Sequence, residues 1–296
     1  MDSLRAQLKT NRPNLSDSTI KTYLSLLSNL YKKINGSGDM LQWFEKNIPK
    51  VMDFIKDDTT NSRKTKLAVM VSLLSHKDEK DLAKLREMML NDATKYNESL
   101  RDQQLTEKQK KNWMTQDEVM KVWKDLYKQN APFLKKEKLT KPQWNGVLNL
   151  ILLSLYVLQP PRRSKDYAMM KTKDYDDKTD NFYDGKHFYF NQYKTAKNYG
   201  EQSVKVSPKL NTMLKQWLKI NHHPTLLATY VGKPLSVSRM TLLLNAIFGK
   251  NVASSMLRHI YLSSQYKDIP ALKKMDQTAK EMGHSTDQAL EYVKKQ

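Results

Sequence analysis

The residues of this sequence whose types and spacing could do chemistry are arginines, lysines, a histidine and a tyrosine in its second half. They occur in the segments QPPRRSKDYAMMKTKDYD, FYFNQYKTAKN, SMLRHI, and GHS followed by LEYVKK. Planar guanidinium groups can neutralise the charge that a phosphodiester transition state develops on its non-bridging oxygens. A lysine can protonate a leaving oxygen, and a tyrosine hydroxyl can be a nucleophile. Such a set can carry out phosphoryl transfer without a metal ion.

The sequence lacks the residues that several other enzyme classes require. Its 296 residues include no cysteine, which excludes disulfides, Cys-ligated zinc, iron–sulfur clusters and a cysteine nucleophile. The nucleotide-binding patterns GxxxxGKS/T and GxGxxG, the GxSxG elbow and HExxH are also absent. One carboxylate cluster could suggest a two-metal nuclease, but it surrounds a predicted turn, where aspartate favours local backbone hydrogen bonds. The cluster comprises Asp174, Asp176, Asp177, Asp180 and Asp184. We therefore expect no metal and no other cofactor.

The charge of the chain indicates a polyanionic partner. The formal net charge is +20, and it is unevenly distributed. Residues 1–100 carry 17 basic and 13 acidic side chains, and residues 101–250 carry 27 basic and 13 acidic ones, so the balances are +4 and +14. A basic field of this size attracts nucleic acid. A lysine-rich composition that only keeps the protein soluble is the alternative.

The first hundred residues predict a helical domain. Ser16 is a candidate N-cap, and apolar residues from Ile20 to Ile34 recur at helical spacing. Further helical patterns cover residues 40–55, 60–74 and 78–97. Residues 98–112 lack apolar periodicity. We therefore predict a domain at 1–100, a linker at 101–112 and a second domain at 113–296.

The second domain is predicted to be helical around a small antiparallel sheet. Thr115 and Glu118 form a capping box, and the apolar run 144–158 predicts a buried helix. Asp184-Gly185 predicts a hairpin of strands 182–183 and 187–193, with a third strand at 203–207. Further helices are predicted at 208–221, 238–248, 251–265, 269–282 and 286–294. The predicted fold class is mainly α with a small three-stranded antiparallel sheet, and Lys194 lies at the exit of its second strand.

The segment QPPRRSKDYAMMKTKDYD resembles the first arginine motif of the tyrosine recombinase (phage integrase) family. That motif is broadly R-x-x-E/D, a hydrophobic pair, a basic residue and W-x-D-x-D. With Arg163 as the motif arginine, Asp166 falls on the acidic position, whereas the choice of Arg162 would put Lys165 there. Arg163 is therefore the predicted motif residue, although Thr172 stands where the family often has tryptophan.

The hairpin and a later helix carry two further matches. FYFNQYKTAKN resembles the family's second strand with its K-T/G-x-K ending, which puts Lys194 on the catalytic lysine, with Lys197 as the second choice. The segment SMLRH resembles the H-x-L-R-H box, with Arg258 as the second clamp arginine and His259 as a packing or supporting residue. Ser255 replaces the box's usual first histidine. A hydroxyl can hydrogen-bond a phosphate but cannot take up a proton near neutral pH.

The last motif lies close to the end of the sequence. Gly283-His284-Ser285 resembles the family's G-H-S motif, which makes His284 a predicted catalytic residue. In the family pattern the nucleophilic tyrosine follows about nine residues later, and here Tyr292 follows at eight. No other tyrosine follows the motif, so the resemblance makes Tyr292 the predicted nucleophile.

The resemblance covers residues 113–296, while residues 1–100 resemble the family's core-binding domain in size, helical character and position. It implies a site-specific recombinase that cuts and rejoins double-stranded DNA through a covalent 3′-phosphotyrosyl link, without ATP, metal or cofactor. It also implies a homo-oligomer, a tetramer, assembled on DNA. No apolar run reaches the roughly 20 residues that a bilayer needs. We therefore expect a soluble intracellular protein, in cytoplasm or nucleus, without membrane or small-molecule partners.

Two alternatives remain open from the sequence. A type IB topoisomerase-like enzyme would use related chemistry as a monomer to relax supercoils, although the R-x-x-D and L-R-H boxes and the domain order favour a recombinase. A catalytically impaired DNA-binding protein of the same fold is supported by Ser255 and by the short spacing between His284 and Tyr292.

Overall fold

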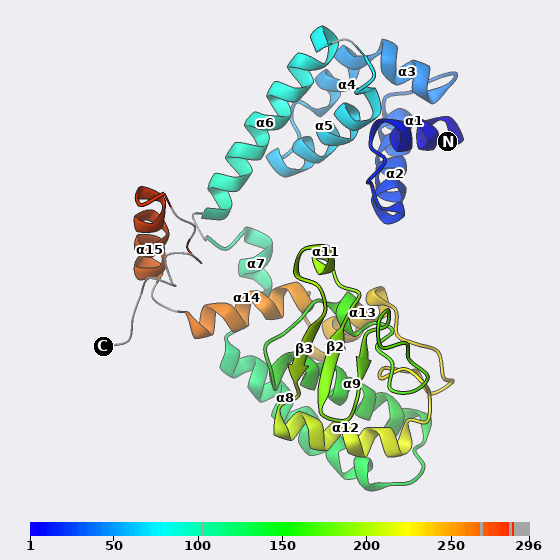
Figure 1. Ribbon diagram of the computed structural model, residues 1–296, viewed down its shortest axis with the longest axis vertical. Helices are drawn as coiled ribbons and strands as arrows, with labels where there is room; N and C mark the ends of the chain where they lie inside the picture. Colours follow the sequence, from blue (N-terminus) through cyan, green and yellow to red (C-terminus); the bar gives the residue numbers. More distant parts are fainter. Residues whose placement is uncertain (78, 102–103, 267–268, 284–285, 287–296) are drawn as a thin grey trace. The chain divides into compact units, whose positions relative to one another are not determined.

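The computed structural model describes residues 1–77, 79–101, 104–266, 269–283 and 286 (Figure 1). The chain divides into two compact units, Met1–Leu105 (unit 1) and Thr106–Gln296 (unit 2). The described residues are mainly helical, and unit 2 contains a three-stranded antiparallel sheet. This confirms the predicted fold class. No helix within the described ranges is both long and apolar enough to cross a bilayer.

The described residues of unit 1 form helices that pack around one apolar core. These helices are α1 (Asp2–Asn11), α2 (Asp17–Lys33), α3 (Met40–Lys46), α4 (Ile48–Ile55), α5 (Thr60–Leu74) and α6 (Glu79–Arg101). As predicted, Ser16 caps α2, and its hydroxyl accepts a hydrogen bond from the Thr19 amide at 3.2 Å. Helix α5 packs against α6 and contributes fully buried side chains such as Leu67 and Met70 to the core.

The helix predicted over residues 40–55 is two helices. Helix α3 ends at Lys46, and Asn47 leaves the helical conformation with φ −120° and ψ 29°. Pro49 lies in the first turn of α4, where its missing amide hydrogen is no loss. Inside one continuous helix, the same proline would remove a hydrogen bond and clash with the preceding turn. The prediction was wrong because the apolar spacing continues across this break.

A bidentate ion pair joins α5 to α6. The Nε and Nη2 groups of Arg63 donate to the two carboxylate oxygens of Asp92 at 2.7 and 2.6 Å. Nη1 of Arg63 donates to the backbone carbonyl of Lys56 at 2.6 Å. Asp92 is only 2% exposed, so Arg63 rather than water compensates its charge. The hydrogen bonds from Arg63 hold the pKa of Asp92 below its usual value.

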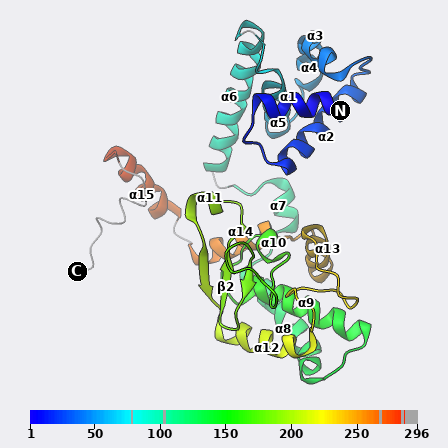
Figure 2. The ribbon, with the colours of Figure 1, turned by 45° about the vertical axis from the view of Figure 1, so that its right-hand side comes forward.

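Several helices of unit 2 pack around α9 (Lys141–Val157), the buried helix predicted at 144–158. Almost every side chain from Trp144 to Val157 is buried. Helices α8, α12 and α13 and the 3₁₀ turn η1 pack against α9 (Figures 1 and 2). Their bounds, with those of the remaining helices, are α7 (Glu107–Asn112), α8 (Gln116–Asn130), η1 (Ala131–Lys135), α10 (Ser164–Tyr167), α11 (Ala196–Tyr199), α12 (Pro208–Ile220), α13 (Val237–Phe248), α14 (Ser254–Gln265) and α15 (Ile269–Glu281).

Much of the segment 98–112, which lacks apolar periodicity, is helical. Helix α6 continues to Arg101, and α7 begins after Thr106. Thr106 and Gln109 form a capping box, in which each side chain bonds the other residue's backbone amide. A capped helix needs no apolar stripe to form its first turn, so periodicity did not reveal it. The linker role of 101–112 and the predicted domain limits stay predictions.

The sheet of unit 2 confirms the predicted hairpin, although its second strand ends at Phe190 and not at Tyr193, so Lys194 lies in the connection beyond it. Its strand order is β1 (Phe182–Tyr183), β2 (His187–Phe190) and β3 (Gln202–Lys205), and both pairings are antiparallel. The Asp184 carboxylate accepts the backbone amides of Lys186 and His187 at 2.7 and 2.6 Å, and Gly185 adopts φ +98°. Phe190 at the end of β2 is fully buried in the core. The connection after Phe190 leads to the candidate lysine.

Replacing Asp92 by asparagine should lower the free energy of unfolding by about 3 kcal/mol at pH 7, because Arg63 would keep a charge without its partner. In the wild type, the lowered pKa of Asp92 gives stability that is complete above the unfolded-state value of about 3.9. That stability is lost as the pH falls through the lower folded-state pKa, and the variant should lack this loss. Urea unfolding of the full chain across this pH range measures both effects.

The matched control is Asp53→Asn, which breaks an exposed ion pair with Lys56. Exposed pairs contribute little to stability, so this control should unfold like the wild type. Equal destabilisation by Asp53→Asn and Asp92→Asn would contradict the role assigned to the buried pair.

Candidate functional site

Three arginines line one open pocket of about 250 Å³ in unit 2. They come from two separate segments, the doublet before α10 and helix α14. The connection between β2 and β3 supplies a further part of the wall. The lining residues are Pro161, Arg162, Arg163, Asp166, Tyr193, Thr195, Tyr199, Gln202 and Arg258.

The doublet Arg162-Arg163 lies at the pocket because of the prolines before it. Helix α9 ends at Val157, and Pro160-Pro161 cannot supply the amide hydrogens that a continued helix needs. The chain is extended at Arg163, with φ −71° and ψ 148°, and α10 begins at the next residue. The two neighbouring arginines therefore enter different surroundings.

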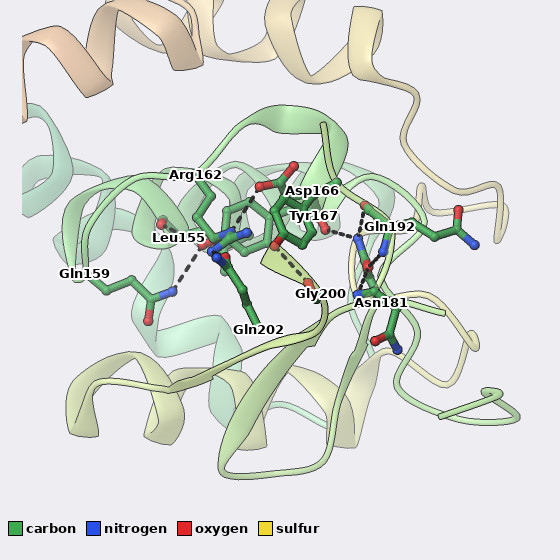
Figure 3. Close-up of polar contacts among 11 residues, drawn as sticks. Leu155, Gln159, Arg162, Asp166, Tyr167, Asn181, Gln192, Gly200 and Gln202 are labelled. Carbon is green, nitrogen blue, oxygen red and sulfur yellow. Dashed lines mark hydrogen bonds and ion pairs between the residues drawn. The ribbon is translucent and has the colours of Figure 1, made fainter. Parts of the chain in front are cut away.

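The side chain of Arg162 is bound within the protein (Figure 3). Its Nε donates to Oδ2 of Asp166 at 3.0 Å, and its Nη1 donates to Oε1 of Gln202 at 2.9 Å. Its guanidinium carbon lies 3.8 Å from the ring centroid of Phe190, which is cation–π geometry. The carboxylate of Asp166 is 3% exposed, so Arg162 compensates a buried charge.

Arg163 and Arg258 have no such partners. Neither side chain makes a hydrogen bond or an ion pair with any described residue, and Nε of Arg258 is buried without an acceptor. Burial and the neighbouring Arg163 cation lower the pKa of Arg258, which nevertheless stays charged because an arginine titrates far above neutral pH. A buried donor without a partner calls for a ligand or water. Two half-buried guanidinium groups without hydrogen-bond or ion-pair partners among the described residues suit an oxyanion with several acceptor oxygens.

Asn181 ties α10 to the end of the hairpin through four hydrogen bonds. Its Nδ2 donates to the backbone carbonyls of Asp166 and Gln192 at 3.0 and 2.9 Å (Figure 3). Its Oδ1 accepts the backbone amides of Asn191 and Gln192 at 2.8 and 2.7 Å. This buried amide uses its full hydrogen-bonding capacity and fixes the chain just before Lys194.

The structure brings some of the predicted site residues together. Arg163, Arg258 and Asp166 line the pocket, and Arg162, set aside by motif spacing, lines it too. Lys194 is exposed and is not among the lining residues. The residues on either side of it, Tyr193 and Thr195, do line the pocket.

Other predicted site residues lie outside the pocket. Lys197 is exposed on α11. Ser255 and His259 are exposed on α14, so His259 differs from the packing position expected for it. His284 and Tyr292 lie outside the described residues.

Sequence reasoning missed several residues that build the site, among them Asn181, Tyr193, Thr195, Tyr199 and Gln202. Polar residues beside a hairpin are interpreted as turn residues, and nothing in their spacing marks a buried hub or a pocket wall. Tyr199 is 69% exposed, and it lines the same pocket as the three arginines.

The aspartate cluster near the hairpin forms local bonds. Asp180 accepts from Nζ of Lys171 and from the Asp176 amide, each at 2.8 Å. The hydrogen bond from Lys171 lowers the pKa of Asp180. Asp176 in turn accepts the amides of Lys178 and Thr179 at 2.8 and 3.2 Å. These carboxylates therefore organise turns, as their positions predicted.

Comparison with known proteins gives matches among solved structures. No protein-family model and no curated protein matches the chain. The XerA recombinase structure aligns with 90% of this chain and 85% of its own, at 11% identity and a TM-score of 0.36. A lambda integrase dimer bound to a COC′ core site aligns over 90% of this chain and 70% of its own, at 16% identity and a TM-score of 0.48. A lambda integrase(75-356) dimer bound to a COC′ core site aligns over 97% of this chain and 92% of its own, at 15% identity and a TM-score of 0.47. Both proteins are tyrosine recombinases, the family whose motifs this sequence resembles.

The free protein should tolerate the loss of a pocket charge. Arg258→Met keeps the side-chain length and removes a charge that burial and Arg163 disfavour. The Tm of the variant should therefore be about 1–3 °C above that of the wild type, which corresponds to a gain of up to about 1 kcal/mol. Inorganic phosphate should raise the Tm of the wild type and leave that of the variant unchanged, because only the wild type binds the anion tightly.

The measurement compares the Tm of each protein in phosphate with its Tm in sodium chloride of equal ionic strength. Lys165→Met is the control, because Lys165 is exposed on α10 and is not among the lining residues. This variant should respond to phosphate as the wild type does. An Arg258→Met protein that is less stable than the wild type and still responds to phosphate would contradict the assignment.

Proposed function

We propose that this protein is a tyrosine recombinase that cuts and rejoins duplex DNA through a covalent 3′-phosphotyrosyl intermediate. The observation that carries the proposal is that Arg163 and Arg258 line one pocket, where neither guanidinium group has a hydrogen-bond or ion-pair partner among the described residues. Each comes from a segment that resembles an arginine motif of the family. The large positive charge of residues 101–250 supports DNA as the partner.

The proposed site holds the scissile phosphate between the two arginines. Each planar guanidinium donates paired hydrogen bonds to non-bridging oxygens, whose negative charge grows in the transition state. Donors that are already oriented toward that charge stabilise the transition state more than the bound substrate. Arg162 contributes less charge to this field, because Asp166 neutralises it.

The proposed nucleophile is Tyr292 and the proposed general acid is Lys194. The tyrosine oxygen forms a bond to phosphorus as the bond from phosphorus to the 5′-oxygen breaks, and Lys194 donates a proton to that leaving oxygen. The phenolic proton is lost to water, because the cations of Arg163 and Arg258 stabilise the phenolate. His284 hydrogen-bonds the phosphate. The phosphodiester energy stays in the tyrosyl link, so a 5′-hydroxyl can reverse the step without ATP.

Recombination also requires an assembly on DNA. We propose that residues 1–100 grip the duplex from one side, and that four copies of the chain assemble on two DNA sites. This step follows from the family resemblance and from the chemistry, since exchange of strands between two duplexes needs a cleavage at each of four strands.

A catalytically impaired DNA-binding protein is the second candidate. One observation favours it. Ser255, which stands where the family usually has a histidine, is exposed and is not among the residues that line the pocket. The described site therefore offers the tyrosine no general base from this position.

Tyr292→Phe should abolish the covalent DNA adduct and leave DNA binding and folding intact, because it removes one oxygen atom. Suicide substrates made from the DNA that flanks the gene trap the intermediate, and mass spectrometry of the adduct identifies the modified residue. Tyr199→Phe is the matched control, since Tyr199 is a tyrosine that lines the arginine pocket. We expect this control to form the adduct at a rate close to that of the wild type.

The outcomes separate the candidates. An adduct on Tyr292 alone supports the recombinase. An adduct that persists in Tyr292→Phe and maps to Tyr199 would refute the nucleophile. DNA binding without an adduct in the wild type would support the impaired protein.

A further inference from the structure

The two arginines of the doublet differ in how much of each side chain is free. Arg162 is bonded to Asp166 and Gln202 and stacked on Phe190, whereas Arg163 has no partner among the described residues. A guanidinium group held on three sides is poorly placed to reorient toward a substrate. Its contacts instead reach the part of the chain that carries Lys194.

Arg162 holds both ends of this part of the chain. At the entry, its guanidinium carbon lies 3.8 Å from the Phe190 ring centroid and 5.4 Å from that of Tyr193. At the exit, its Nη1 donates to Gln202, the first residue of β3. The residues between these ends, 193–200, are called the lysine segment below, because they include Lys194 and Lys197.

The lysine segment is also closed on itself. The Tyr193 hydroxyl donates to the backbone carbonyl of Gly200 at 2.8 Å, and the Ala196 amide donates to the backbone carbonyl of Tyr193 at 3.2 Å. The ring of Tyr193 is 8% exposed and anchors one side of this closure. The Tyr193 hydroxyl and the pairing of Phe190 with Gln202 thus close the segment, and Arg162 contacts both of its ends.

The same arginine fixes the segment to the arginine pocket. Its partner Asp166 lies three residues after Arg163, in α10. The backbone carbonyl of Asp166 also accepts from Asn181, which holds Gln192. Two residues thus connect α10, which follows Arg163, to the lysine segment. Asn181 reaches the chain just before the segment, and Arg162 contacts both of its ends.

We propose that Arg162 is a positioning residue, which fixes the lysine segment so that Lys194 reaches the leaving oxygen of a phosphate held by Arg163 and Arg258. This inference rests on the proposed function and adds to it a division of labour within the doublet. Arg163 acts on the phosphate, and Arg162 acts on the general acid.

The test uses Arg162→Lys in the full chain. A lysine keeps a charge for Asp166 but cannot also bond Gln202 in a fixed plane or stack as a guanidinium does. We expect amide hydrogen exchange within the lysine segment to become about 10-fold faster in the variant, and exchange in α9 to stay unchanged. This readout needs no DNA cleavage, so it stands even if the proposed function fails.

A second arm measures cleavage of two DNA substrates. On ordinary DNA, the cleavage rate of Arg162→Lys should be about 10-fold or more below that of the wild type. General acid catalysis typically supplies a rate enhancement of about 10²- to 10⁴-fold, and a misplaced Lys194 loses part of it. On DNA with a 5′-bridging sulfur, whose thiolate leaves without a proton, the loss should shrink to less than about 3-fold. Lys194→Ala should show the same pattern. Arg163→Lys should be slow on both substrates.

Gln202→Leu is the second variant, and it guards against misfolding of Arg162→Lys. It removes only the bond at the exit of the lysine segment, and a smaller loss with the same dependence on the leaving group is expected. Lys165→Met is the charge control and should match the wild type in both arms.

Unchanged exchange in the lysine segment of both variants would overturn the inference. So would equal losses of Arg162→Lys on the two substrates, which would mean that Arg162 acts on the phosphate. Faster exchange together with no cleavage by the wild type would uphold the positioning role and count against the proposed function alone.

Discussion

The carboxylate of Asp166 can neutralise one arginine of the doublet, and the charge available at the candidate site depends on which arginine it pairs with. Asp166 is buried and pairs with Arg162. Arg163 is left with its full charge at a pocket that also receives Arg258. Had Asp166 paired with Arg163, the pocket would hold a compensated ion pair there, and an anion would gain much less from binding. The single carboxylate therefore divides two identical side chains into a bound one and an available one.

The surroundings of the pocket explain how the protein tolerates two cations without hydrogen-bond or ion-pair partners among the described residues. Helix α9 is buried along almost its whole length and ends where Pro160-Pro161 turn the chain, so the doublet starts from a rigid element. Asn181 and the hairpin fix the opposite wall through a fully bonded amide. Burial and the repulsion from Arg163, which together lower the pKa of Arg258, are thus maintained by the packed core around the pocket. Such a local conflict within a well-packed fold is typical of functional sites.

The sequence predicted the parts of the fold that depend on local rules. Ser16 and Thr115 cap helices as expected, and Asp184-Gly185 forms the hairpin turn, because each effect acts within a few residues. The break at Pro49 was missed, since apolar spacing alone does not detect a lost amide hydrogen. Motif spacing also predicted Arg163 and Arg258, which line the pocket.

The parts that were not predicted depend on contacts between distant segments. Spacing set Arg162 aside, and its role became visible only with Gln202, which is forty residues further along the chain. Asn181 is similar, because its four bonds reach α10 and the end of the hairpin at once. A single sequence does not show which distant residues meet in the fold, so it gives no signal for residues such as Arg162 and Asn181 that connect several segments.

The central claim is that Arg163 and Arg258 stabilise negative charge on a phosphate during cleavage. The most direct measurement replaces the scissile phosphate with a neutral methylphosphonate and compares the cleavage rates of the wild type and Arg163→Lys. On ordinary DNA the variant should be about 10²-fold slower, as expected for a lost transition-state donor. On the neutral linkage the two rates should converge, because one of the two non-bridging oxygens, and with it one negative charge, is absent from the transition state. An equal 10²-fold defect on both substrates would contradict the account.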